Sequence, residues 1–161
     1  MKREDFERLY EEHAQPLFGF LVYRTGDRVE AEDILGEAFL RALRARKRFD
    51  RRRGTEKAWL YSIALNVLRD QVRRSAAESR ALERVEAVAA AEGGGGIEDV
   101  EDRDLVLRAL EKLSPEEREA IALRYGGQLT VPEMARALDL PLRTVESRVH
   151  RSLRKLRQDL R

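Results

Sequence analysis

The chain has no cysteine, and aromatic residues make up only 6% of its 161 residues. Without cysteine, disulfides and thiol chemistry are excluded. The two histidines, His13 and His150, lie far apart on separate helical patterns, which disfavours a zinc site. No apolar run approaches the roughly 18 residues that a membrane span needs, and no signal-peptide pattern opens the chain. We therefore expect a cytoplasmic protein without a membrane segment, metal or cofactor.

Charged residues are abundant, at 39% of the chain, but their signs are unevenly distributed. Residues 1–75 carry 17 basic and 13 acidic side chains, a net charge of +4. Residues 76–102 carry 2 basic and 8 acidic side chains, a net charge of −6, and residues 103–161 carry 13 and 9, again +4. Two basic segments flank an acidic one, which suggests two units that face nucleic acid.

The acidic segment also predicts a domain boundary. It contains four consecutive glycines at 93–96, which cannot hold a helix because each costs about 1 kcal/mol relative to alanine. Residues 76–92 can be helical in part. We therefore predict an N-terminal domain over residues 1–75, a flexible linker over 76–102 and a C-terminal domain over 103–161.

Outside the linker the chain reads as helix, and no segment shows the alternation of a strand. The spacing predicts helices over Lys2–Tyr23, Val29–Arg46 and Lys57–Arg74 in the first domain. Pro16 predicts a kink or break in the first of these. The fold class is all-α, with two small helical domains. The residues predicted to be buried in the first domain are Phe6, Leu9, Tyr10, Leu17, Phe18, Leu21, Ile34, Leu35, Ala38, Phe39, Ala42, Leu43, Leu60, Ile63, Ala64, Val67, Leu68 and Val72.

The second domain shows clear helix start signals. Ser114–Glu117 and Thr130–Glu133 each fit a capping box with proline in the first turn. After Leu138, the segment Asp139–Pro141 predicts a short turn, and a long basic helix follows over Leu142–Asp159. A helix, a three-residue turn and a longer helix form a helix-turn-helix.

The outer face of that last helix is basic and polar, and it continues with Arg154, Lys155 and Arg157. Such a helix fits the major groove of DNA, where arginine pairs with guanine and Ser or Thr reaches bases or phosphates. The alternative is a solvated basic face without a partner. The candidate DNA-binding residues on it are Arg143, Thr144, Ser147, Arg148 and Arg151.

A second basic cluster places eight positive charges within residues 44–57. The following helix carries Trp59, Tyr61, Asn66 and Arg69. Positive charge neutralises phosphates, while asparagine and aromatic rings can hold an unpaired base, so the combination suits melted DNA. The alternatives are solubilising charge on a loop and a core role for Trp59.

A third candidate surface lies on the helix predicted over Val29–Arg46. Its mixed-charge side carries Asp33, Glu37, Arg41 and Arg44, with Leu40 beside them. Such a face can dock on a partner helix, although most are merely solvated.

Four segments together resemble extracytoplasmic-function (ECF) sigma factors of bacterial RNA polymerase. Ala31–Ala42 resembles their polymerase-binding segment, and Trp59–Asn66, with Asp70, is similar to their promoter-melting helix. Leu113–Arg118 and Thr144–Arg151 resemble their second DNA-binding module. The matches occur in the family's order and span nearly the whole chain outside the acidic segment.

The resemblance implies a non-catalytic protein that gives core RNA polymerase its promoter specificity and stabilises melted DNA. The implied partners are the clamp helices of the largest polymerase subunit, promoter DNA and an anti-sigma factor. Asp70 is expected to brace its helix. The loop Asp50–Glu56 would capture a flipped base of the −10 element. The implied contacts are Asp33, Glu37, Leu40 and Arg41 for polymerase; Arg51, Arg52, Arg53, Gly54, Lys57, Asn66 and Arg69 for the −10 element; and Arg143, Thr144, Ser147, Arg148 and Arg151 for the −35 element.

The sequence departs from the family's pattern at four positions. Leu65 stands where Arg or another polar residue often precedes the motif asparagine, and Asp139 replaces a glycine common in the turn. Arg143 and Glu146 replace a frequent Gly and Lys, which bears on promoter sequence.

Two other functions stay open: a stand-alone helix-turn-helix regulator, and a nucleic-acid-processing enzyme. The enzyme would need carboxylate or histidine clusters at catalytic spacing.

Overall fold

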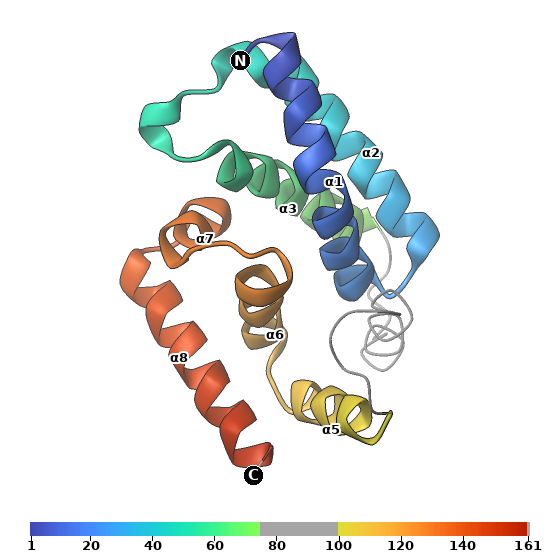
Figure 1. The fold of residues 1–161 in the computed structure, drawn as a ribbon, viewed down its shortest axis with the longest axis vertical. Helices are drawn as coiled ribbons and strands as arrows, with labels where there is room; N and C mark the ends of the chain where they lie inside the picture. Colours follow the sequence, from blue (N-terminus) through green and yellow to red (C-terminus); the bar gives the residue numbers. More distant parts are fainter. Residues whose placement is uncertain (75–99, 161) are drawn as a thin grey trace.

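The computed structural model describes residues 1–74 and 100–160, and every regular element in these ranges is helical (Figure 1). The all-α prediction is therefore confirmed. The predicted linker, apart from its last three residues, lies outside the described ranges. The α-helices are α1 (Arg3–Thr25), α2 (Arg28–Ala45), α3 (Glu56–Arg74), α5 (Val100–Glu111), α6 (Pro115–Ile121), α7 (Val131–Leu138) and α8 (Leu142–Asp159). Two short 3₁₀ helices, η1 (Arg46–Arg48) and η2 (Arg51–Arg53), and a short π-helix, η3 (Ala122–Gly126), complete the described elements.

The N-terminal module consists of α1, α2 and α3, packed around a common apolar core. Gly26 ends α1 in the left-handed conformation, with φ of 70°, which glycine adopts without steric cost. Asp27 then caps α2, because its side chain accepts hydrogen bonds from the backbone N–H groups of Val29 and Glu30. The tight Gly-Asp junction folds α2 back along α1.

Three predictions for this module are corrected. Of the kink or break predicted at Pro16, the break does not occur, because α1 continues through the proline; this residue is exposed, so water can hydrate the carbonyl that loses its hydrogen bond. Tyr10 is 50% exposed, with its ring against the edge of Phe39, and Val72 is 51% exposed. Both residues lie at the margin of the apolar stripe of their helices.

The C-terminal module consists of α5, α6, α7 and α8. Both predicted capping boxes are present: the Ser114 and Thr130 side chains accept from the N–H groups of Glu117 and Glu133, and each glutamate accepts in return. Asp139 adopts the left-handed conformation, with φ of 53°, and so makes the sharp turn between α7 and α8. The helix-turn-helix prediction is confirmed.

The two modules pack directly against each other. Helix α7 lies on α3, and η3 lies on α1, so buried residues of both modules form one continuous cluster. Figure 1 shows α7 beside the start of α3, with α8 descending along the outer edge of the molecule. This packing brings residues 53–55, near the end of the basic loop, next to α7.

Candidate nucleic-acid interface

Helix α8 is held by its inner face and leaves its outer face exposed. Val145 and Val149 are buried, and so is Ser152, whose hydroxyl donates to the Arg148 carbonyl at 2.6 Å. Among the predicted −35 contacts, Arg143, Ser147 and Arg151 are exposed, while Thr144 and Arg148 are partly buried. The structure therefore places all five on the accessible part of α8 and near its N-terminal half, the part of such a helix that reaches base edges.

Ion pairs fix the distal half of α8 to the rest of its module. Lys155 Nζ donates to Glu117 Oε1 on α6 at 2.7 Å, and Lys112 Nζ contacts Asp159 Oδ1 at 3.0 Å. Burial of the Glu117 carboxyl opposes ionisation, but hydrogen bonds from Lys155 and Ser114 outweigh it and hold the pKa below its usual value. Lys155 therefore braces the module instead of lying on the basic face where the sequence placed it.

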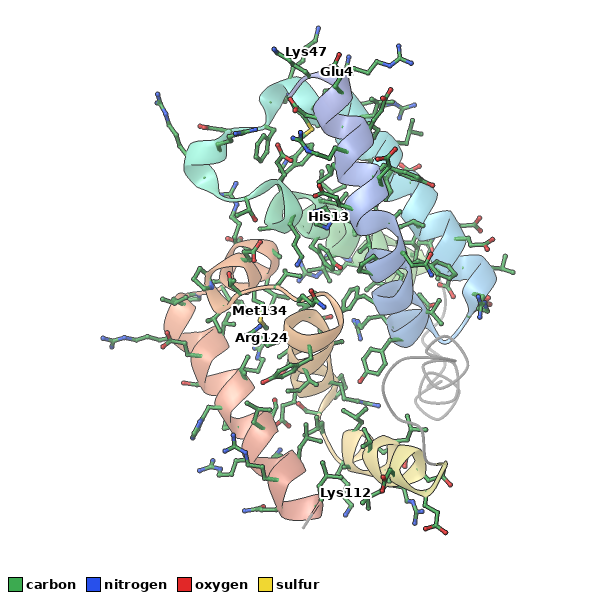
Figure 2. All side chains as sticks on the ribbon, viewed as in Figure 1. Glu4, His13, Lys47, Lys112, Arg124 and Met134 are labelled. Atoms are coloured by element: carbon green, nitrogen blue, oxygen red, sulfur yellow. The ribbon has the colours of Figure 1, made fainter. Side chains whose placement is uncertain are left out.

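The basic loop is largely exposed. Lys47, Arg48, Arg51, Arg52 and Arg53 all extend into solvent, and Figure 2 shows Lys47 pointing away from the protein beside the start of α1. The loop is shaped by Asp50, whose side chain accepts from the Arg52 N–H, and by the packing of the Phe49 and Trp59 rings, 5.2 Å apart. Trp59 therefore serves as a partly buried anchor for the loop.

The predicted −10 residues do not share one environment. Asn66 and Arg69 on α3 are exposed, as are the three arginines of η2. Gly54 and Lys57 instead face the C-terminal module: the Lys57 ammonium donates to the Gln128 carbonyl in the turn before α7 at 2.8 Å, and the Arg136 side chain of α7 lies over Gly54. In this arrangement part of the predicted site is already occupied by the chain itself.

Tyr61 corrects one suggestion from the sequence, that it could stack on a base. It is fully buried where the modules meet, near Phe20 and the backbone of Gly127. Burial raises the pKa of its phenol well above the usual value. The aromatic ring is core in this structure.

The predicted polymerase-binding residues share one face of α2. Asp33 and Leu40 are exposed, Leu40 to 40%. Arg41 Nε donates to Glu37 Oε1 at 2.9 Å, and one terminal nitrogen reaches Asp70 Oδ2 on α3 at 3.3 Å. The hydrogen bond that Arg41 donates to Glu37 stabilises the charged guanidinium and is the main cause that raises the pKa of Arg41 above its usual value. Asp70 thus joins α3 to this face, which we call the docking face (Asp33, Glu37, Leu40 and Arg41).

Sequence reasoning missed the side chains that join the modules. Glu133 was recognised only as a cap, yet its second oxygen accepts from the Thr55 hydroxyl at 2.6 Å. Arg24 at the end of α1 pairs with Glu119 of α6 at 3.0 Å, and Arg136 was assigned no role. No local pattern could have found these pairs, because their members lie more than 70 positions apart in the chain.

Two negative observations hold for the described parts of the chain. Residues 1–74 and 100–160 contain no group of three acidic or histidine side chains able to hold a metal ion. In the same ranges, no helix has the length and apolarity to cross a membrane.

Comparisons with known proteins match both modules. The profile of Sigma-70 region 2 matches residues 9–78, and that of Sigma-70 region 4 matches residues 103–156. The first profile covers α1 to α3, with the basic loop and docking face, and the second covers α5 to α8. The chain thus has the two-region organisation of a sigma factor.

Individual relatives and a solved structure resemble this chain over nearly its whole length. ECF RNA polymerase sigma factor SigL of Mycobacterium tuberculosis is 32% identical, covering 94% of this chain and 86% of SigL. BldN of Streptomyces coelicolor, also an ECF sigma factor, is 31% identical over 96% of this chain but only 61% of its own length. A solved structure of CnrH, in complex with the cytosolic domain of CnrY, superposes with a TM-score of 0.69 at 26% identity, covering 99% of this chain and 89% of CnrH.

The chain belongs to the ECF family of RNA polymerase sigma factors. Sigma factors are non-catalytic transcription initiation factors, and this chain acts with RNA polymerase in promoter-specific initiation.

Proposed function

We propose that the two modules act at two promoter positions while the docking face binds the polymerase. In this proposal residues 1–75 bind core enzyme and recognise and melt the −10 element, and residues 103–161 read the −35 element. The protein itself catalyses no reaction and works in the cytoplasm with the polymerase. Binding energy, not an active site, opens the DNA.

The exposed face of α8 is the observation that carries this proposal. Its N-terminal and middle turns present Arg143, Ser147 and Arg151 to solvent, and the ion pairs of Lys155 with Glu117 and of Asp159 with Lys112 hold the far end of the helix to its module. A rigid basic helix after a tight turn is the arrangement that enters the major groove. Arginine pairs with guanine there through two hydrogen bonds, which gives sequence preference as well as affinity.

The N-terminal module supports the second half of the proposal. Its loop arginines Arg51, Arg52 and Arg53, together with Gly54 and Lys57, would surround a base flipped from the −10 element, with Asn66 and Arg69 on the supporting helix. The packed rings of Phe49 and Trp59 anchor the loop, so its positive charges are held in a defined position. Unpaired DNA is held by such a combination of positive charge and polar side chains.

The docking face is proposed to bind the clamp helices of the largest polymerase subunit. Leu40 supplies the apolar centre, and the hydrogen bonds of Arg41 to Glu37 and Asp70 hold the charged rim in place. An anti-sigma factor is proposed as a further partner, supported by the likeness to CnrH, which was solved in complex with the cytosolic domain of another protein.

Run-off transcription with core polymerase over a randomised promoter library tests the function. We expect transcripts from a defined class of promoters with separate −35 and −10 elements. Leu40→Asp should abolish co-purification with core polymerase, whereas Leu105→Asp, an apolar residue of similar exposure on α5 (42% against 40%), should leave it intact. A protein that neither binds core enzyme nor redirects transcript starts would refute the proposal. Duplex binding without polymerase would then favour the stand-alone regulator.

A further inference from the structure

Helix α8 presents two neighbouring rows of exposed side chains along its first three turns. Residues four positions apart lie one above the other on a helix, so the exposed positions fall into rows. The first row belongs to the −35 contacts proposed above and consists of Arg143, Ser147 and Arg151. The second row runs beside it and consists of Leu142, Glu146 and His150. A duplex that meets the first row therefore also meets the second.

Glu146 stands out in the second row because it is acidic within a basic helix. Helix α8 carries six arginine and lysine residues but only two acidic ones, Glu146 and Asp159. Asp159 lies at the far end and contacts Lys112 Nζ at 3.0 Å. The Glu146 carboxylate is exposed and forms no hydrogen bond or ion pair with any residue in the ranges 1–74 and 100–160. It is therefore available to a ligand.

The backbone that carries Glu146 is held in place by the core of its module. The preceding residue, Val145, is fully buried, and Val149, one turn later, is buried as well. Lys155 contacts Glu117 at 2.7 Å and so holds the distal part of the helix to α6. Recognition of a base requires side chains that are placed to within about 0.5 Å, and a packed helix supplies such a support.

A carboxylate in the major groove discriminates among the bases. It repels the phosphates and can only accept hydrogen bonds, so a favourable contact needs a donor on a base edge. Guanine and thymine present acceptors there, whereas cytosine N4 and adenine N6 carry donors. Adenine also places its N7 acceptor beside that donor, where it faces the negative charge. Cytosine is therefore the base whose major-groove edge best matches a glutamate.

We propose that Glu146 determines part of the promoter specificity: its carboxylate accepts a hydrogen bond from the N4 amino group of a cytosine in the −35 element. Guanine or thymine at the same place would leave the carboxylate opposite an acceptor, which costs binding free energy. Glu146 thus contributes preference for a base more than affinity for DNA. This inference rests on the −35 role proposed above for α8.

Substitutions at Glu146 test this in the complete holoenzyme. Run-off transcription uses core polymerase and promoters with a randomised −35 region, each linked to a barcode in its transcript. Sequencing then gives the preference for each base at each position. Glu146→Gln removes the charge but keeps the shape, and a glutamine amide matches N6 and N7 of adenine. Glu146→Ala removes the polar group. Glu111→Gln, the same charge change at an exposed position of α5, is the matched control.

We expect the wild type to prefer cytosine over guanine or thymine at one −35 position, by about five- to hundredfold. Glu146→Ala should abolish this preference and leave the other positions unchanged. Glu146→Gln should shift the preference at the same position to adenine. Both variants should also raise transcription from all promoters, because the loss of a negative charge favours DNA binding at any sequence. Glu111→Gln should show the base preferences of the wild type.

Two results would overturn the inference. One is a wild-type −35 element that has clear base preferences but no position that favours cytosine. The other is a pair of Glu146 variants that raise transcription uniformly while every base preference stays the same, since the carboxylate would then act through its charge alone. Circular dichroism checks that each variant is folded.

Failure of the −35 role itself has a different signature. In that case the wild type would show no base preference at any −35 position, and Arg143→Ala and Arg148→Ala would leave the result of the library unchanged. Preferences elsewhere in the −35 element that respond to Arg143→Ala or Arg148→Ala but not to the Glu146 variants would keep the role of α8 and refute only the cytosine contact.

Discussion

The basic loop of the N-terminal module and the recognition helix α8 carry similar charge but differ in how they are covered. Thr55 of the loop contacts Glu133 of α7, and Lys57 contacts Gln128 in the turn before α7, whereas Arg143 at the start of α8 is exposed to solvent. A duplex can therefore approach α8 directly, while a single strand meets a loop that the chain itself already contacts. The difference teaches that two surfaces with the same composition can differ in availability because of tertiary packing alone.

A substitution in the buried face of α7, the helix that contacts the loop, should have the largest effect on stability. Met134 is fully buried on α7, so Met134→Ala should lower the free energy of unfolding by about 2–5 kcal/mol, through lost burial and the cavity left behind. Urea denaturation followed by circular dichroism measures it. Leu142→Ala, in the same module but exposed, should cost well under 1 kcal/mol. A loss below 1 kcal/mol for Met134→Ala would mean that α7 is not packed as described.

On helix α8, Arg148→Ala should weaken recognition of the −35 element by about 1–3 kcal/mol of binding free energy if its side chain reads a base, and −35-dependent transcription should fall accordingly. Run-off assays on promoters with altered −35 elements provide the measurement, and Arg157→Ala is the control. Unchanged preference among −35 variants would argue against base reading by Arg148.

Tyr61→Phe should stabilise the folded chain. It removes a buried hydroxyl that has no hydrogen-bond partner while it keeps the ring, so the free energy of unfolding should rise by about 1 kcal/mol. The melting temperature, followed by circular dichroism, should rise by a few degrees. Tyr10→Phe, where the ring is half exposed, should leave the melting temperature unchanged. A lower melting temperature for Tyr61→Phe would show that the hydroxyl has a partner in solution.

The smallest expected effect is a pH dependence from His13, which Figure 2 labels near the centre of the molecule. Burial lowers its pKa below the usual 6.5, and the Lys57 charge adds to this, while Glu12, Glu133 and Glu56 oppose it. Because the unfolded chain then binds the proton more readily, stability should fall as the pH drops below about 6.5. His13→Gln should flatten the melting temperature between pH 7 and pH 5.5. The carboxylates of Glu117 and Glu133 contribute only at lower pH, since their pKa values are also lowered.

Local signals in the sequence predicted much of the fold. The capping boxes at Ser114 and Thr130 specify where α6 and α7 begin, since the side chains that satisfy the first N–H groups are only three positions apart. Asp139 tolerates the left-handed turn that separates α7 from α8. The helix does not break at Pro16, because a proline on the exposed side of a long helix leaves a carbonyl that water can satisfy.

The candidate site was predictable in its parts but not in its assembly. The exposure of Arg143, Ser147 and Arg151 follows from the 3.6-residue period of α8. The position of the docking face follows in the same way from the helical period of α2. Burial of Tyr61 does not, because it depends on a glycine 66 positions away that lets another module approach. The role of Asp70 in holding Arg41 likewise depends on how α3 crosses α2.

The sequence by itself determined the helices, their caps and the two charged faces, because these depend on residues within one or two turns of each other. Only the tertiary structure decided which surfaces stay open. The pairs Thr55 with Glu133, Lys57 with Gln128 and Arg24 with Glu119 join residues distant in the chain, and their contact depends on the packing of α7 and α6 against the N-terminal module. Local periodicity carries no information about such packing, since it arises from the shapes of two complete modules.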